Sequence, residues 1–232
     1  MTAARGEPEE AGLEPGRALD ALLRVSAALA VGDEAVLRAE LAVARERCPA
    51  ERIEESLLQA YLFLGFPAAI HAFSVWRETA PARADDPDGD EDPDLETRRA
   101  DGEARCRRIY GPAYDRLRAR MRELHPALDR WMIEEGYGKG LARPQLPPRE
   151  RELCAVALLA AGGFGPQLGA HARGALHVGA TGAEVGRAVD IGTGMARAHA
   201  GTRPDPEAMR AVWSVIEEGL EGGCSSISSG SG

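Results

Sequence analysis

Apolar residues recur every three or four positions along most of this chain, which is the spacing of one face of an α-helix. In the first half, no useful length of sequence alternates apolar and polar residues with the period of two that a strand shows. Glycine and proline divide the pattern: one segment ends at Gly32, Asp33 can cap the next, and Pro67 suits the first turn of another. The first half therefore predicts helices at residues 17–31, 34–48, 51–64 and 67–80.

The second half continues the helical pattern after an acidic segment. A helix over residues 103–124 is expected to kink near Gly111 and Pro112, and Thr181 is a candidate N-cap. Further helices are predicted at residues 126–136, 148–163, 166–179, 181–201 and 206–220.

The acidic segment separates the two halves. Residues 85–96 read DDPDGDEDPDLE, and their mutual repulsion and prolines favour a solvated linker. A calcium-binding loop is the alternative, but the glycine is misplaced and no terminal Glu stands at loop spacing. We expect a flexible leader at 1–16, a degenerate helical repeat at 17–80, an acidic linker at 81–101, a second helical domain at 102–221 and a disordered tail at 222–232.

Composition and charge narrow the class of protein. The 28 Lys and Arg residues against 37 Asp and Glu residues give a formal charge of −9, which argues against a nucleic-acid partner. The chain contains no run of about 18 apolar residues, so a membrane span is not expected. Its first residues lack the apolar region of a signal peptide. We therefore expect a cytoplasmic protein without a membrane partner. The four cysteines form no CxxC pair, so neither a zinc site nor a disulfide framework is expected.

The two halves also resemble each other. The segment that begins near Leu22 aligns with the segment that begins near Leu153 almost without gaps. In this register Glu40 corresponds to His171, and Ala21 corresponds to Glu152. Duplication of a helical unit explains the match, although two helical hairpins rich in Ala and Leu also align by chance.

Glu152 and His171 are the strongest candidates for chemistry. They lie on two predicted helices joined by a short glycine-rich break, and antiparallel helices of a hairpin face each other. A carboxylate beside an imidazole fixes the tautomer of the ring and favours general acid–base catalysis. Gln167 precedes His171 by one helical turn and could orient a polar substrate group. A purely structural Glu–His contact is the alternative.

The same segment resembles the carboxymuconolactone decarboxylase and alkylhydroperoxidase D-like family. The peroxidase branch of that family has a glutamate, eleven residues, and then C-x-x-C-x-x-x-H. Counted from Glu152, the cysteine positions fall on Phe164 and Gln167, and the histidine falls on His171. The stretches GYGKGLARPQLPPRERELCAVALLA and HARGALHVGATGAEV are also similar to decarboxylase-type sequences.

The resemblance implies an all-α fold of duplicated alkylhydroperoxidase D-like repeats and a homotrimer with a small-molecule substrate. No metal or cofactor is expected, because no second ligand stands at metal-binding spacing from His71, His125 or His199. It implies a lyase that uses Glu152 and His171 on a carboxylated lactone or related organic acid, with Phe164 shaping an apolar wall. Tyr137 and Arg143 could bind a substrate carboxylate, and structural roles for both remain open. Peroxidase activity is not expected without the thiolate pair, because Cys154 points away from Glu152 and suits a buried position.

A function of another class remains open. The chain could be a non-catalytic helical assembly or binding protein that retains the fold without its cysteines. Gly222 and Gly223, followed by Cys224 and a Ser- and Gly-rich end, resemble a double-glycine leader junction. The folded part would then be a carrier for a processed C-terminal tail, and a plain disordered tail is the alternative.

Overall fold

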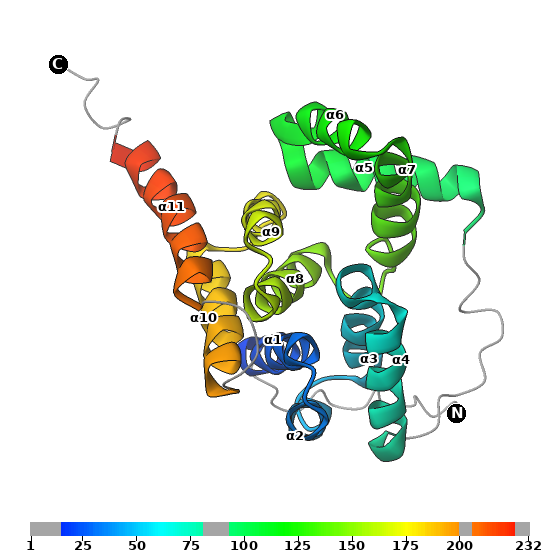
Figure 1. Ribbon diagram of the computed structural model, residues 1–232, viewed down its shortest axis with the longest axis vertical. Helices are drawn as coiled ribbons and strands as arrows, with labels where there is room; N and C mark the ends of the chain where they lie inside the picture. The colour runs from blue at the N-terminus through cyan, green and yellow to red at the C-terminus, as the bar shows by residue number, and fades with distance from the viewer. Residues whose placement is uncertain (1–14, 81–92, 200–205, 226–232) are drawn as a thin grey trace, which may run out of the picture.

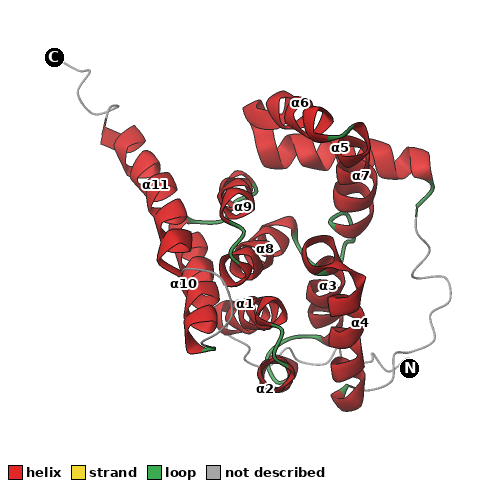
Figure 2. Ribbon diagram, viewed as in Figure 1, coloured by secondary structure: helices red, strands yellow, loops and turns green. Residues whose placement is uncertain are grey.

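The computed structural model describes residues 15–80, 93–199 and 206–225, and the regular structure of these ranges is entirely helical, as Figure 2 shows. The predicted all-α class is therefore confirmed for this part of the chain. The predicted leader up to residue 14, the acidic run at 81–92 and the end of the tail at 226–232 lie outside the described residues.

The N-terminal half contains α1 (Pro15–Val31), α2 (Glu34–Arg45), α3 (Ala50–Gln59) and α4 (Tyr61–Thr79). Asp33 caps α2 as the sequence predicts, because its Oδ1 accepts hydrogen bonds from the backbone nitrogens of Ala35 and Val36 at 2.9 and 3.2 Å. The first helix begins at Pro15, inside the predicted leader.

The helix predicted over residues 51–64 is interrupted at Ala60, whereas the break that the sequence predicts at Gly65 is present. The chain turns by 118° between α3 and α4, whereas Gly65 forms a second break within α4 with a φ of 81°. The turn places Leu57 in the main hydrophobic core and points the ring of Phe63 at His171. A straight helix could not satisfy both contacts.

The second half begins with α5 (Leu95–Tyr110), the 3-10 turn η1 (Gly111–Ala113) and α6 (Tyr114–Leu124), so the predicted kink is confirmed. The helix starts earlier than expected, inside the predicted linker at 81–101. Asp94 explains this start, because its Oδ1 accepts a hydrogen bond from the backbone nitrogen of Thr97 at 2.8 Å.

The short α7 (Pro126–Trp131) continues into η2 (Met132–Gly140), a π-helix, so the predicted end at Gly136 is wrong. The wider helix packs directly on α5. A Cβ at position 138 would lie 2.0 Å from the carbonyl oxygen of Arg98, so the two backbones meet where Gly138 has no side chain. This tertiary contact favours continuation beyond the glycine at 136.

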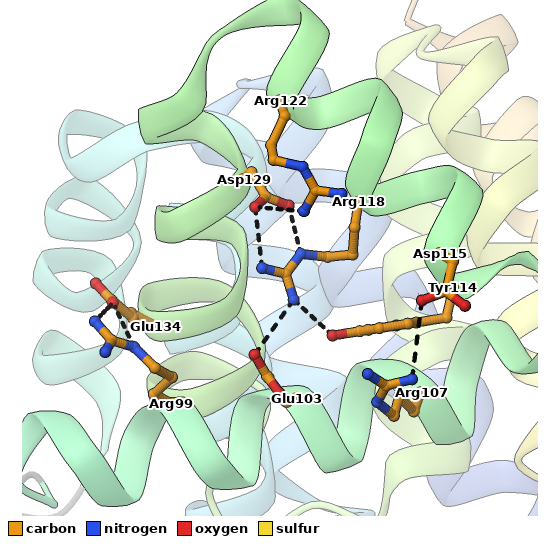
Figure 3. Close-up of polar contacts among 9 residues, drawn as sticks. All are labelled: Arg99, Glu103, Arg107, Tyr114, Asp115, Arg118, Arg122, Asp129 and Glu134. Atoms are coloured by element: carbon orange, nitrogen blue, oxygen red, sulfur yellow. Dashed lines mark hydrogen bonds and ion pairs between the residues drawn. The ribbon is translucent and has the colours of Figure 1, made fainter.

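Ion pairs hold α5, α6, α7 and η2 together (Figure 3). Arg118 on α6 bonds to both carboxylate oxygens of Asp129 on α7 and donates to the hydroxyl of Tyr114 at 2.5 Å. Arg122 also reaches Asp129, at 3.2 Å. Asp129 is buried, and these partners compensate its charge.

The last helices are α8 (Pro148–Gly162), α9 (Gly165–His177), α10 (Gly182–Ala198) and α11 (Pro206–Ser225). Thr181 caps α10 as predicted, in a reciprocal arrangement with Glu184. The backbone of α11 continues through residues 222–225, which were expected to belong to the disordered tail.

The central helix is α8, with α1, α9 and α10 packed on it and α3–α4 at its other side (Figure 1). Its side chains from Arg151 to Ala161 are all buried. Small residues such as Ala157 and Ala160 let neighbouring helices approach on every side. The direct packing of α1 on α8 brings the two halves together, whereas duplication stays a prediction.

No single helix among the described residues is long and apolar enough to cross a membrane. The bent pair α3 and α4 meets the length and composition criteria only jointly.

Candidate functional site

The first turn of α8 is anchored by Arg151, a fully buried arginine. Its Nη2 donates to Oε2 of Glu55 on α3 at 2.6 Å and to the carbonyl of Arg143 at 2.8 Å, while its Nε donates to the carbonyl of Leu146 at 3.0 Å. Burial lowers the pKa of Arg151, and the carboxylate of Glu55 opposes that effect. The network fixes the start of α8, and therefore the position of the next residue, Glu152.

The structure brings Glu152 and His171 together across the α8–α9 hairpin. Oε2 of Glu152 lies 2.8 Å from Nδ1 of His171, which is hydrogen-bonding distance. Relative exposure is 1% for Glu152 and 8% for His171, so bulk water screens the contact little. The predicted juxtaposition is confirmed, although no catalytic role follows from the contact alone.

The ring of His171 is held on another side by Phe63. The two ring centroids are 5.3 Å apart with an interplanar angle of 78°, an edge-on contact. Nε2 of His171 has no hydrogen-bonding partner within the described part of the chain, whereas Nδ1 is occupied by Glu152. The imidazole is therefore oriented through Nδ1, and Nε2 makes no hydrogen bond to the described residues. Sequence reasoning missed Phe63, because only the turn before α4 brings it here.

The carboxylate of Glu152 lies tightly against α9. A Cβ at position 174 would be 2.8 Å from Oε2 of Glu152 and 2.6 Å from Cγ2 of Ile109, so the space is available only because residue 174 is glycine. The sequence could have indicated this position, because Gly174 follows His171 by one helical turn and therefore lies on the same face of α9.

Two tyrosines stand near Glu152. The hydroxyl of Tyr137 donates to the hydroxyl of Tyr110 at 2.9 Å, and the rings meet edge-on with centroids 6.0 Å apart. Burial raises the pKa of Tyr110, and the nearby Glu152 raises it further. Burial likewise raises the pKa of Tyr137, with Tyr110 and then Glu152 adding to the effect. Both hydroxyls therefore remain protonated at neutral pH.

The other predicted site residues are placed differently. Gln167 is exposed at the start of α9 and makes no hydrogen bond within the described residues. Phe164 is 41% exposed in the α8–α9 connection and packs over Gly162. Both remain accessible to a ligand, but neither contacts His171 in the interactions described.

The structure does not support substrate binding by Tyr137 or Arg143. Tyr137 is buried in the cluster of Cys106, Ile109 and Ile133, with its hydroxyl committed to Tyr110. Arg143 donates from Nε to Oε1 of Glu55 at 2.8 Å. Long-range packing, which spacing cannot reveal, gives both side chains partners within the protein, and their part in substrate binding stays a prediction.

The cysteines with described side chains are buried and free. Burial raises the pKa of Cys154 to about 12, of Cys106 to about 12 and of Cys48 to about 11. Each therefore remains a thiol near neutral pH, which does not favour attack on peroxide. In the ranges that the structure covers, no group of three or more His, Cys, Asp and Glu residues is arranged to hold a metal ion.

The corresponding positions in the N-terminal half make a different contact. Glu40, which aligns with His171, accepts hydrogen bonds from Nε and Nη2 of Arg24 at 2.8 and 2.5 Å. Ala21, which aligns with Glu152, is buried in the core. This half therefore presents an ion pair in place of a carboxylate–imidazole pair.

These features define an all-helical protein with a buried carboxylate–imidazole pair between the arms of a helical hairpin. Residues 126–202 match the model of the carboxymuconolactone decarboxylase family. The matched region contains the α8–α9 hairpin, and with it both Glu152 and His171. No curated protein matches the chain.

Proposed function

We propose that the protein is a carboxymuconolactone decarboxylase-like lyase in which His171 moves a proton to or from a small carboxylated lactone or related organic acid. The observation that carries this proposal is the 2.8 Å contact between Nδ1 of His171 and Oε2 of Glu152 in a buried hairpin. The family match supports the class of reaction.

Glu152 acts as a positioning residue. Its carboxylate accepts a hydrogen bond from Nδ1–H, and the lone pair of the neutral ring is therefore on Nε2. Nε2 then serves as the base, and the protonated ring serves as the acid on the return step. Phe63 prevents rotation of the ring away from this alignment.

Decarboxylation requires a proton for the carbon that loses CO₂ and stabilisation of the enolate charge that develops there. A protonated imidazole can supply both. Gln167, one turn before His171, is the candidate to polarise a substrate carbonyl, and Phe164 is the candidate apolar wall. Isomerisation or ring opening would use the same groups.

The test is a screen of carboxylated lactones and hydroperoxides with the wild type and His171→Ala. We expect CO₂ release or loss of lactone absorbance with the wild type, and no turnover with His171→Ala. Glu152→Gln should lower kcat by about 10²–10⁴-fold and change the pH profile of kcat/KM, since an amide does not control the tautomer as a carboxylate does.

The matched control is His71→Ala, which removes an exposed histidine from α4. This variant should retain wild-type turnover. Circular dichroism must show that His171→Ala is still helical. Turnover by a folded His171→Ala protein at the wild-type rate would refute the proposal.

A further inference from the structure

A hollow lies between the α5–α6 region and α9, and its lining includes Gly174, whose Cβ position faces Oε2 of Glu152. Figure 1 shows α5 and α6 on one side of this region and α9 on the other. The hollow has a volume of about 470 Å³, within the range of sites for small ligands. We refer to it as the α6–α9 pocket and define it by the lining residues Ile109, Tyr110, Leu117, Arg116, Arg173 and Gly174.

The walls of the α6–α9 pocket are mainly apolar. Ile109 from α5 and Leu117 from α6 supply branched side chains, whereas Ala113 and Ala170 leave room between them. Gly174 forms part of the α9 wall, directly in front of the buried carboxylate of Glu152. The pocket therefore suits a ligand with a compact apolar body.

Two arginines bring positive charge to this apolar pocket. Arg116 and Arg173 line it, and neither has a carboxylate partner within the described ranges. Arg120 and Glu123 also line the pocket and pair with each other at 3.3 Å, and the nearby Arg118 pairs with Asp129. In a chain with a formal charge of −9, two uncompensated guanidinium groups in one hollow favour an anionic ligand.

Tyr110 adds a neutral donor to the wall. Its hydroxyl oxygen accepts the proton of Tyr137, so its own proton has no acceptor among the described residues. Burial keeps the pKa of this hydroxyl above its usual value, and the hydroxyl can therefore donate at neutral pH.

We propose that the α6–α9 pocket binds a small organic carboxylate with an apolar body, such as an aryl carboxylate. Arg116 and Arg173 supply charge-assisted hydrogen bonds to the carboxylate, and the ring packs on Ile109 and Leu117. The apolar walls favour this ligand over inorganic phosphate, which has no apolar part. Binding here does not require turnover at His171.

The experiment measures binding of benzoate and of its uncharged analogue benzamide to the full-length protein by calorimetry or NMR titration. We expect saturable benzoate binding, with benzamide at least tenfold weaker. Arg116→Ala and Arg173→Ala should each weaken benzoate binding by about tenfold, because each removes a hydrogen bond to a charged group. Higher salt should also weaken benzoate binding.

The charge-matched control is Arg197→Ala, which removes an exposed arginine of α10 that does not line the pocket. It should bind benzoate like the wild type. Equal affinity for benzoate and benzamide would overturn the proposal, as would an equal loss in Arg197→Ala and Arg173→Ala. Such a result would leave the proposed lyase function intact, because that function is tested by turnover.

Discussion

Gly174 makes room for the contact between Glu152 and His171. Any side chain there would begin 2.8 Å from Oε2 of Glu152, inside the distance that a carbon and an oxygen tolerate. The neighbouring Ile109 closes the remaining space. The geometry of the candidate site therefore depends on a residue that carries no chemistry.

Gly174→Ala should separate the carboxylate of Glu152 from His171. We expect an overpacking cost of about 1–3 kcal/mol in the free energy of unfolding, measured by urea denaturation. The ring-nitrogen NMR signals of His171 should change as well. Gly182→Ala is the control, because a Cβ at that position of α10 meets no atom within 4 Å. Wild-type stability and wild-type His171 signals in Gly174→Ala would contradict this account.

At the scale of elements, α8 and α10 meet at backbone distance. A Cβ at position 192 would lie 2.4 Å from the carbonyl oxygen of Ala157 and 2.8 Å from Cβ of Ala160. The sequence motif GTGM therefore marks a close approach of two helices, and α8 is the helix that carries Glu152.

Gly192→Ala should lower the free energy of unfolding by about 1–3 kcal/mol, because the helices must move apart. Gly194→Ala on the same helix is exposed and meets nothing within 4 Å. It should stabilise the protein by up to about 1 kcal/mol through helix propensity. Thermal or urea unfolding of the two variants compares their free energies of unfolding. Equal changes in both variants would show that helix propensity, and not the close packing of α8 and α10, sets the effect of an alanine.

The packing of α6 against α7 should depend on acid pH through Asp129. Hydrogen bonds from Arg118 lower the pKa of Asp129 below its ordinary value of about 3.9. A depressed carboxyl pKa gives stability that is present above the unfolded pKa and is lost as the pH falls through the folded pKa.

Asp129→Asn should therefore be less stable than the wild type at pH 7. The difference in melting temperature should shrink as the pH falls from about 4 towards the depressed folded pKa of Asp129, because the stabilising carboxylate is protonated over that range. Thermal unfolding followed by circular dichroism between pH 7 and pH 3 measures this. A difference that stays constant over the whole range would show that the carboxylate does not stabilise through its charge.

At the scale of the whole molecule, α4 carries an apolar surface. Phe66 and Ile70 lie one turn apart and are 67% and 64% exposed. Neighbouring apolar side chains at this exposure favour an interface with another molecule. The sequence resemblance predicts a homotrimer, and α4 is the helix that we expect to contribute to it.

Light scattering after size exclusion should give three times the 24.7 kDa mass of the chain. Phe66→Asp with Ile70→Asp should give a smaller species, because buried charges in an apolar interface are costly. Val215→Asp on α11 is the control for an exposed apolar residue elsewhere. A wild-type monomer at micromolar concentration would refute the trimer.

The sequence alone determined the local structure. Asp33 and Thr181 place the starts of α2 and α10, Pro148 lies in the first turn of α8, and glycine ends that helix. Capping and helical periodicity act over a few residues, so they can be read without a fold. The contact of Glu152 with His171 was also predictable, since a short connection leaves a helical hairpin little other geometry.

Only the tertiary structure decided what surrounds that contact. The turn before α4 brings Phe63 to His171, whereas Tyr137 and Arg143 turn away to Tyr110 and Glu55. The α6–α9 pocket likewise joins residues more than fifty positions apart. These contacts depend on how whole helices pack against one another and on which charged side chains pair. The spacing of residues along the chain determines neither of these.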